Sequence, residues 1–341
     1  MRAILVGLGV VGQSLLQMLS ERYEELRDRY GLGLRIVAVA DSGGAVAKAS
    51  GLNPARVLQA KRAGGLKSLG DGNFTDDALG LIGELEADVL IDATPTNIVD
   101  GEPSYSYIRS AILHGLDVVT VSKGGLALYF PALKELAAHR GVVLRFSGTV
   151  GGGMPVIEFG KECGRSDRLE KVVGVLNGTT NYILSRMEDT GQTFRDALSE
   201  AQRLGYAERD PTLDISGLDT ACKITILANE VLGMGATLSD VKVSGIEEIS
   251  VDEVRAARER GLAVRLLGVA DGRRLEVSPQ TVGERDPLAV KGALNAVTFK
   301  ASYSGSHTIT GKGAGGPETA TSILRDLVAV KKVRVAEVSR I

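Results

Sequence analysis

A chain of 341 residues is long enough for two domains. Its 44% hydrophobic and 24% charged residues are ordinary for a soluble globular protein, and a net charge of −2 gives no electrostatic case for binding nucleic acid. The two cysteines, Cys163 and Cys222, form no C-x-x-C pair, and the apolar runs are too short to cross a membrane. Because a strand-like run begins at Arg2, no signal peptide is expected. These features predict a cytoplasmic protein without disulfides or a zinc site.

Residues 2–41 have the pattern of a dinucleotide-binding fingerprint. A β-rich run, residues 2–6, leads directly into G-x-G-x-x-G and a helical pattern, and a second β-rich run ends at Asp41. In this fold the first glycine allows a tight turn, the second lets the backbone approach a pyrophosphate, and the third lets the helix pack close to the strand. The pyrophosphate meets free N–H groups at the helix N-terminus. The predicted cofactor loop is Gly7, Leu8, Gly9, Val10, Val11 and Gly12, with a simple glycine-rich turn as the alternative.

The residues that follow bear on the choice between NAD and NADP. A carboxylate at Asp41 normally accepts hydrogen bonds from the adenosine ribose and repels a 2′-phosphate, which favours NAD. Lys61 and Arg62 could instead offer a cation to that phosphate, although solvated surface side chains are the simpler interpretation. The residues alone therefore do not decide between NAD and NADP.

Two further strand ends are predicted to border the cofactor. Strands are expected at 89–91 and 118–121, and the carboxyl ends of parallel strands line the ligand crevice of such a sheet. The residues at these ends are Thr94, Pro95, Ser122 and Lys123. The alternative for Lys123 is a solvated loop position. Residues 44–80 predict helix and loop, and helices are expected at 104–114 and 131–139. The alternation predicts an α/β, Rossmann-type, doubly wound parallel sheet.

The chain changes character after the glycine-rich stretch 147–155, whose carbonyls could bind a hard cation, although a hinge is the commoner role. A strand is predicted over 169–175, a capped helix after Asn177-Gly178, and an antiparallel sheet within 263–299. The last helix is expected to return to the first domain. We therefore predict a dinucleotide-binding domain, residues 1–148 and about 308–341, and an α+β substrate-binding and dimerisation domain with a mostly antiparallel sheet, residues 149–307.

The stretch Leu204–Lys223 concentrates ionisable side chains, namely Glu208, Asp214, Asp219 and Lys223. Asp219 and Lys223 are four residues apart on a predicted helix, 216–232, so their charged groups share one face. Pro211 keeps the preceding residues out of that helix, so Glu208 lies in a loop before it. Acids and an amine that converge could hold a small amino acid and move a proton. The simpler alternative is a surface salt bridge.

Several motifs together resemble the homoserine dehydrogenase family. They are GLGVVG (7–12), VSKGGLA (121–127), TVGGGMP (149–155), VLNGTTNYIL (175–184), GYAERDPTLDISGLDTACK (205–223) and GKGAGGPETA (311–320). The resemblance covers nearly all of the chain. The chain resembles the short, monofunctional form of this family, which has neither a C-terminal regulatory domain nor an aspartate-kinase module.

This resemblance implies the reversible interconversion of L-homoserine and L-aspartate 4-semialdehyde with NADP or NAD, in threonine, methionine and isoleucine biosynthesis. It also implies a homodimer formed through the second domain. Lys223 would be the general acid/base and Lys123 a second ammonium near the reacting oxygen. Asp219 and Lys223 would not simply pair with each other, and both would turn towards a bound amino alcohol. The implied substrate contacts are Glu208, Asp219, Asp214, Thr179 and Tyr206, and further cofactor contacts are Ser42, Lys61, Gly205, Glu208 and Gly315.

Three positions depart from the family pattern. Ser147 stands where relatives often carry a Glu that ligates a monovalent cation, so a sodium site here would rest on the backbone carbonyls of Val150 and Gly152. Ser42 stands where relatives that hold NADPH often carry Arg, which weakens the case for NADP. Val10 replaces a Thr of the fingerprint, a mild change because that loop binds mainly through its backbone.

Two other functions fit parts of the pattern. A semialdehyde dehydrogenase that forms a cysteine thioester needs an activated Cys beside a base. Cys163 has no His in its motif, and Cys222 has the pattern of a core residue. A nucleotide-sensing regulator on the same fold would need no proton donor. The presence of all four residues Glu208, Asp219, Lys223 and Lys123 argues against this function.

Overall fold

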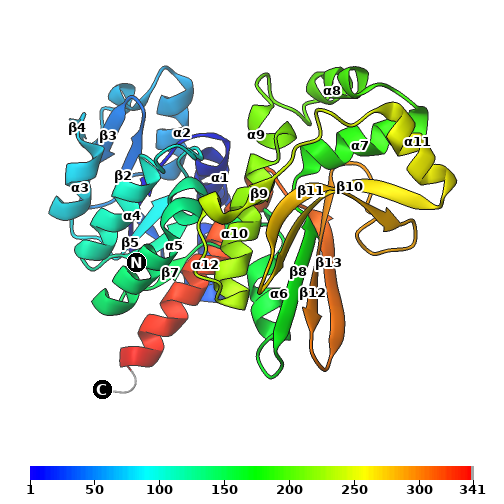
Figure 1. Cartoon of the computed structure of the whole chain (residues 1–341). Helices are drawn as coiled ribbons and strands as arrows, with labels where there is room; N and C mark the ends of the chain where they lie inside the picture. Colours follow the sequence, from blue (N-terminus) through cyan, green and yellow to red (C-terminus); the bar gives the residue numbers. More distant parts are fainter. Residues whose placement is uncertain (339–341) are drawn as a thin grey trace. The chain divides into compact units, whose positions relative to one another are not determined.

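The computed structural model describes residues 1–338, which form two compact units (Figure 1). Unit 1 comprises Met1–Thr149 and the chain from Gly315 onwards, and unit 2 comprises Val150–Ala314. Within the described residues, every helix is too short or too polar to span a membrane.

The described part of unit 1 contains a seven-stranded sheet in the order β4-β3-β2-β1-β5-β6-β7. Its strands are β1 (Arg2–Val6), β2 (Arg35–Asp41), β3 (Gly44–Ala47), β4 (Asn73–Thr75), β5 (Val89–Asp92), β6 (Asp117–Thr120) and β7 (Leu144–Arg145). β2, β1, β5, β6 and β7 run parallel, whereas β3 and β4 are antiparallel additions at one edge. The chain leaves β1 for β2 on one side and later returns to β5 on the other. The Rossmann-type sheet is therefore confirmed, with its switch point beside β1.

Helices cover both faces of this sheet. They are α1 (Val10–Tyr30), α2 (Pro54–Arg62), α3 (Ala78–Glu84), α4 (Ser104–Leu113), α5 (Gly124–Arg140) and α12 (Gly316–Val338), with 3₁₀ turns η1 (Leu66–Leu69) and η2 (Ser147–Thr149). The late helix α12 packs along α1, where Leu15 and Leu19 share a buried cluster with Ile323 and Leu327 (Figure 1).

Two segments of unit 1 differ from the prediction. Residues 44–80, expected as helix and loop, also contain the antiparallel pair of strands β3 and β4, with α2 and η1 between them. Helix α5 begins at Gly124, well before the predicted start at Pro131, and bends at Tyr129, whose φ and ψ are not helical. The proline ring clashes with the carbonyl four residues earlier and breaks the hydrogen-bond ladder, so the sequence pattern revealed the second half of the helix alone.

Unit 2, which is described throughout, contains a six-stranded sheet in the order β13-β12-β8-β10-β11-β9. Its strands are β8 (Leu169–Val175), β9 (Lys242–Val243), β10 (Leu262–Asp271), β11 (Leu275–Gly283), β12 (Leu294–Ala301) and β13 (Gly305–Lys312). Its helices are α6 (Val156–Cys163), α7 (Gly178–Thr190), α8 (Phe194–Arg203), α9 (Thr212–Ile215), α10 (Leu218–Leu232) and α11 (Val251–Glu259), with the 3₁₀ turn η3 (Leu238–Asp240). Every pairing except that of β11 with β9 is antiparallel, as predicted.

The predicted domain boundary near residue 308 falls inside β13. That strand pairs with β12 from Gly305 to Lys312, so the chain stays in unit 2 until Ala314.

Helix α10 lies close against β10 because a glycine faces it. A Cβ at Gly268 would lie 3.1 Å from Ile224 Cβ and 3.2 Å from Thr220 Cγ2, so a larger residue would push the helix outward. Since α10 also carries Asp219 and Lys223, this packing sets their depth in the unit.

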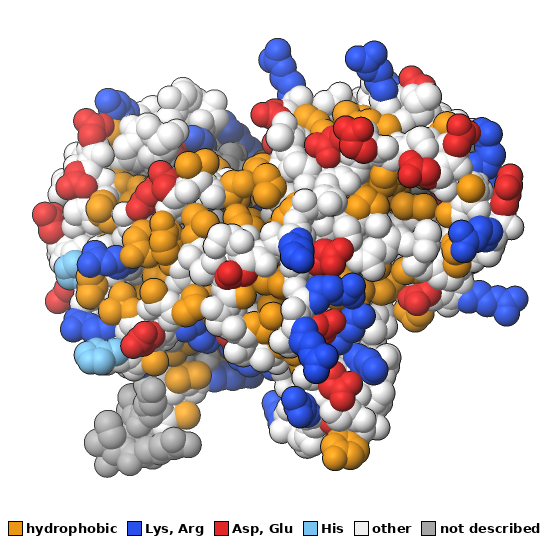
Figure 2. Space-filling view, in the orientation of Figure 1, with side chains coloured by type: hydrophobic (Ala, Val, Ile, Leu, Met, Phe, Trp, Pro, Cys, Tyr) orange, Lys and Arg blue, Asp and Glu red, His pale blue; other side chains and the backbone are white. Residues whose placement is uncertain are grey.

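Surface charges on unit 2 form local pairs. On the face seen in Figure 2, Lys and Arg side chains are interspersed with Asp and Glu side chains. The pairs include Lys161 with Glu230, Arg165 with Glu162 and Lys300 with Glu170.

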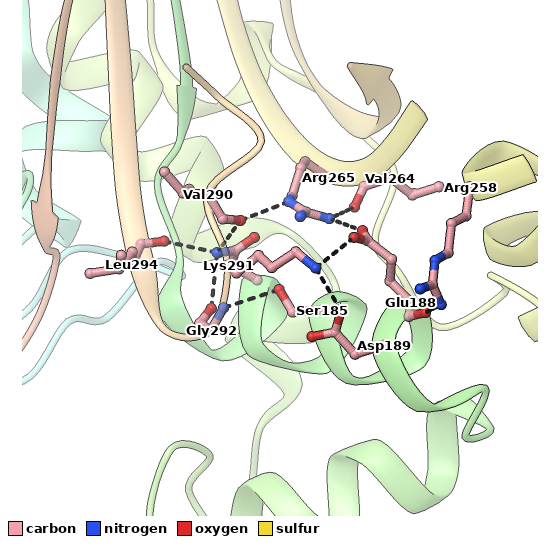
Figure 3. A network of polar contacts seen from close by, with 11 residues as sticks. Ser185, Glu188, Asp189, Arg258, Val264, Arg265, Val290, Lys291, Gly292 and Leu294 are labelled. Carbon is pink, nitrogen blue, oxygen red and sulfur yellow. Dashed lines mark hydrogen bonds and ion pairs between the residues drawn. The ribbon is translucent and has the colours of Figure 1, made fainter. Parts of the chain in front are cut away.

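A buried ion pair ties the loop between β11 and β12 to the end of α7 (Figure 3). Arg265 of β10 is fully buried, and its Nη1 donates to Glu188 Oε2 at 2.8 Å while its Nε donates to the Val290 carbonyl at 2.9 Å. Glu188 also meets Lys291 Nζ at 3.3 Å. The amide of Asn181 adds hydrogen bonds to the carbonyls of Val290, Gly292 and Leu294. Helix α7 is thereby fixed to the sheet at its C-terminal half.

Replacing Glu188 by Ala should lower the free energy of unfolding by about 3–5 kcal/mol, because Arg265 would keep a buried charge without its partner. The matched control is Asp189→Ala, which removes the partly exposed partner of Lys291 and should cost less than about 1 kcal/mol. Urea denaturation followed by circular dichroism measures both. Equal losses in the two variants would contradict a structural role for the buried pair.

Candidate functional site

The outer glycines of the fingerprint are required by the fold itself. Gly7 adopts φ +92°, and a Cβ there would overlap the backbone of Ala93 and Thr94 at the end of β5. A Cβ at Gly12 would overlap the carbonyl oxygen of Gly7, so α1 could not pack onto the turn. The Gly7 N–H donates to the Ala40 carbonyl at 2.8 Å, which joins the loop to the end of β2.

The middle glycine has no such role within the protein. A Cβ at Gly9 would meet no atom within 4 Å, and Gly9 caps α1 without a side-chain hydrogen bond. The adjacent Val10 is 73% exposed. The space beside Gly9 at the N-terminus of α1 is therefore open, which fits a diphosphate group of a dinucleotide. Leu8 differs, because its side chain is buried and its backbone alone is available to a ligand.

The carboxyl ends of β5 and β6 are joined by one buried carboxylate, Asp92. It accepts hydrogen bonds from the Thr94 N–H and hydroxyl, and from the hydroxyls of Ser104 and Thr120. Ser122 Oγ donates to the Pro95 carbonyl at 3.3 Å, and the Lys123 N–H donates to Thr96 Oγ1 at 3.4 Å. The structure thus brings together the predicted residues Thr94, Pro95, Ser122 and Lys123. Sequence analysis did not single out Asp92, although an acid ending a buried strand before small polar residues was a usable signal.

The predicted ribose-binding residues form an ion pair. Lys61 Nζ contacts Asp41 Oδ2, and the Gly43 N–H donates to Asp41 Oδ1 at 2.8 Å. Lys61 is 29% exposed, so it is a partly buried partner of Asp41 rather than the solvated side chain given as the alternative. Ser42 lies in the turn between β2 and β3. A carboxylate and an ammonium therefore stand together where the adenosine ribose is expected.

The start of α12 lies against the start of α1. Gly315 adopts φ +131°, and a Cβ at Gly316 would press on Val10 and Ser14. This places the predicted residue Gly315 next to the fingerprint loop within unit 1.

In unit 2, Lys223 is a buried cation with an ion-pair partner. It is 7% exposed, and its Nζ lies 2.6 Å from Asp219 Oδ2 and donates to the Leu176 carbonyl at 2.6 Å. The two residues pair with each other, and the pair lies mostly out of solvent, unlike the surface salt bridge given as the alternative. That both side chains turn towards a bound amino alcohol stays a prediction. Burial strengthens the attraction because little water screens the two charges.

Asn177 connects this pair to a second carboxylate. Its Nδ2 donates to Asp214 Oδ1 at 2.6 Å and to Asp219 Oδ2 at 2.8 Å. Its Oδ1 accepts from the Thr180 N–H at 2.9 Å and so caps α7. Sequence analysis predicted the cap at this turn, but not the contacts with the two acids, which come from residues 37 and 42 positions further along the chain.

The environment of Asp214 raises the pKa of its carboxyl group above the ordinary value. Burial and the nearby charge of Asp219 raise the pKa of Asp214, while the hydrogen bond from Asn177 and the charge of Lys223 act in the opposite direction. The two carboxylates thus repel each other, and a nearby cation would stabilise the ionised form of both.

Of the remaining predicted substrate residues, Thr179 lies on α7, and Tyr206 and Glu208 lie on the loop between α8 and α9. Thr179 Oγ1 donates to the Tyr206 carbonyl at 2.7 Å, and the Tyr206 ring stacks on Tyr182 with centroids 4.5 Å apart. Gly205 turns the chain at φ +79°. Glu208 is exposed. The cluster therefore consists of Asn177 and Lys223, which are buried, and of Asp214 and Asp219, which are partly buried, with Glu208 on an exposed loop. We refer to these four residues as the buried cluster.

The residue at position 147 does not fit the cation site that the family resemblance implies. The Ser147 N–H and hydroxyl both donate to Asp326 of α12, at 2.8 Å and 2.6 Å, and Arg145 Nε also contacts this carboxylate at 3.2 Å. Ser147 thus acts as a donor rather than as an anionic ligand. Among residues 1–338, no group of three or more His, Cys, Asp or Glu side chains is arranged to hold a metal ion. The carbonyls of Val150 and Gly152 stay a prediction.

Neither cysteine has the environment of a nucleophile. Burial raises the pKa of the Cys163 thiol, and Cys222 is buried in α10. A reactive cysteine needs a lowered pKa, so this geometry does not favour the thioester mechanism.

Comparisons with known proteins show the family to which the chain belongs. Family models described as homoserine dehydrogenase, NAD binding domain, and homoserine dehydrogenase match residues 7–147 and 155–328. The homoserine dehydrogenase of Methanocaldococcus jannaschii is 39% identical over 331 residues, which are 97% of this chain and 98% of that protein. The NAD(+)-dependent homoserine dehydrogenase of Pseudomonas canavaninivorans is 38% identical, over 96% of this chain and 95% of that protein.

A solved hyperthermophilic archaeal homoserine dehydrogenase in complex with NADPH is similar in structure, with a TM-score of 0.84 and 26% identity. The match covers 97% of each chain. The chain therefore belongs to the homoserine dehydrogenase family and is an oxidoreductase that acts on homoserine with NAD or NADP.

Proposed function

We propose that the protein interconverts L-homoserine and L-aspartate 4-semialdehyde with Lys223 as the general acid/base. The observation that carries this assignment is a buried ammonium held between the Asp219 carboxylate and the Leu176 carbonyl. Lysine has three N–H donors, and Nζ has these two partners among residues 1–338. The remaining N–H can donate to the oxygen of a bound substrate.

The proton balance follows from that geometry. In the reductive direction the aldehyde carbon gains a hydride, and its oxygen gains the proton of Lys223 Nζ, which gives the alcohol. In the oxidative direction the neutral amine takes the hydroxyl proton back. Asp219 stabilises the ammonium and aims it, and a fixed donor at the developing alkoxide lowers the barrier without reorganisation.

The cluster also suits the amino end of the substrate. Asp214 and Asp219 set two carboxylates against the single ammonium of Lys223, and Asn177 adds no charge. The excess of negative charge is complementary to an α-ammonium group. Thr179, Tyr206 and the exposed Glu208 are proposed to complete the substrate contacts as the loop closes.

The residues of unit 1 are proposed to hold the nicotinamide cofactor, which accepts or supplies the hydride. The backbone from Gly9 to Val11 would receive the pyrophosphate, and Asp41 with Lys61 would meet the ribose. Lys123 is proposed as a second ammonium near the reacting oxygen. Gly205 and Gly315 are further proposed cofactor contacts.

We also propose that the reaction serves threonine, methionine and isoleucine biosynthesis in the cytoplasm. A homodimer formed through unit 2 is proposed from the family resemblance, and sedimentation equilibrium would test it by giving twice the chain mass.

The proposed reaction predicts that purified protein produces reduced nicotinamide when L-homoserine is added. The readout is the growth of absorbance in the near ultraviolet, with L-serine as the control for chain length. An absence of homoserine turnover with both NAD and NADP would contradict the proposal.

Replacing Lys223 by Ala should lower kcat by about 10²–10⁴-fold, the range expected when a general acid/base is lost. Cofactor affinity, measured by quenching or fluorescence titration of the reduced nicotinamide, should stay near the wild-type value. The matched control is Lys161→Ala, which removes a lysine that pairs with Glu230 at the surface. A Lys223→Ala variant that kept about a tenth of the wild-type rate would overturn the assignment.

Replacing Lys61 by Ala should weaken NADP more than NAD. A 2′-phosphate would lose its neighbouring cation and face Asp41 alone, and a difference of about tenfold corresponds to about 1.4 kcal/mol. Steady-state KM values for the two cofactors provide the measurement. If both KM values changed by the same factor, Lys61 would not discriminate between the cofactors.

A further inference from the structure

One side chain, Asn177, contacts both acids of the buried cluster in unit 2. Its amide donates to Asp214 and to Asp219, and the preceding carbonyl, that of Leu176, accepts from Lys223. We propose that Asn177 is a positioning residue that fixes the spacing of the two carboxylates and thereby directs Lys223 towards the substrate oxygen. This inference rests on the proposed function.

The orientation of the amide is determined by the helix that Asn177 begins. Asn177 Oδ1 accepts from the Thr180 N–H at 2.9 Å, as an N-cap residue does. The oxygen of the amide must therefore point to the helix, and Nδ2 must point away from it. Its two N–H groups are then directed to Asp214 at 2.6 Å and to Asp219 at 2.8 Å. Asn177 is 4% exposed, so water does not compete readily for these bonds.

The contacts of Asp219 show how this spacing reaches the proton donor. Asp219 Oδ2 accepts from Asn177 and also lies 2.6 Å from Lys223 Nζ. Lys223 Nζ is held on its other side by the Leu176 carbonyl, which belongs to the residue next to Asn177. Two neighbouring residues of the turn before α7 thus hold both partners of the ion pair. Moving Asn177 would move the carboxylate that aims the ammonium.

The bridge also affects the pKa of Asp214. The charged and polar groups around it are Asp214 on α9, Asp219 and Lys223 on α10, and Thr179 on α7. The hydrogen bond from Asn177 lowers the pKa of Asp214 against the effects of burial and of the Asp219 charge. Without that bond, Asp214 would keep its proton to a higher pH. A protonated acid cannot attract the substrate ammonium. The acid limb, the part of the pH profile where kcat/KM falls as the pH is lowered, should therefore move to higher pH.

The variant that isolates this role is Asn177→Ser. Serine caps a helix about as well as asparagine does, so α7 keeps its first turn, but its short hydroxyl cannot bridge the two acids. We expect kcat/KM for homoserine to fall about ten- to a hundredfold, as when a hydrogen bond to a charged group is lost. The acid limb should move to higher pH, and the KM for the cofactor should not change. In Asn177→Asp the cap is again kept, while a third carboxylate replaces the donor and should move the limb further.

The matched control is Asn53→Ser, the same change at the N-cap of α2, where Asn53 accepts from the N–H groups of Ala55 and Arg56. This variant should keep the wild-type pH profile. If Asn177→Ser also kept the wild-type kcat/KM and acid limb, the positioning role would be wrong while the proposed function stood. If wild-type protein did not turn over homoserine, the proposed function itself would fail. A loss of kcat/KM without movement of the acid limb would reduce Asn177 to a structural cap and overturn the inference.

Discussion

The structure of unit 2 depends on one constraint, that a charge buried away from water must be paired. Lys223 and Asp219 satisfy this for each other, but they leave Asp214 and the remaining donors and acceptors to be matched nearby. The turn before α7 provides the match with the Leu176 carbonyl and the Asn177 amide. The close packing of α10 on Gly268 keeps the cluster at this depth. The proposed chemistry and the packing of unit 2 therefore draw on the same contacts.

In unit 1, folding and ligand binding depend on different glycines of the fingerprint loop. Gly7 and Gly12 are fixed by steric contact within the protein, since any Cβ there would overlap backbone atoms. A Cβ at Gly9 would meet no protein atom within 4 Å, so the absence of a side chain there leaves space for a ligand. At the carboxyl ends of the strands, Asp92 joins β5, β6 and α4 by hydrogen bonds, whereas Val10 at the start of α1 lies exposed. The packed glycines and the Asp92 hydrogen bonds thus support a loop whose exposed part, at Gly9 and Val10, is open to a ligand.

Much of this was readable from the sequence, because the relevant signals are local. The fingerprint, the strand ends and the alternation of strands and helices predicted the sheet of unit 1, and the i,i+4 spacing placed Asp219 beside Lys223. What could not be read was contact between distant segments. Three such contacts are the bridge from Asn177 to Asp214, the pairing of Lys61 with Asp41 and the pairing of β3 with β4. Each depends on how the chain folds back on itself. The depth of the Lys223 pair likewise follows from tertiary packing, which spacing along a helix cannot reveal.

The position of α12 has a consequence for the order in which the chain can assemble. Unit 2 is one continuous segment, whereas unit 1 needs a helix that is synthesised after all of unit 2. Until α12 emerges, the apolar face of α1 that includes Leu15 and Leu19 lacks the covering of Ile323 and Leu327. Domains generally fold as units during synthesis, with the N-terminal one first. Here the second unit can reach its native state on the ribosome before the first, and the nucleotide-binding sheet is completed last.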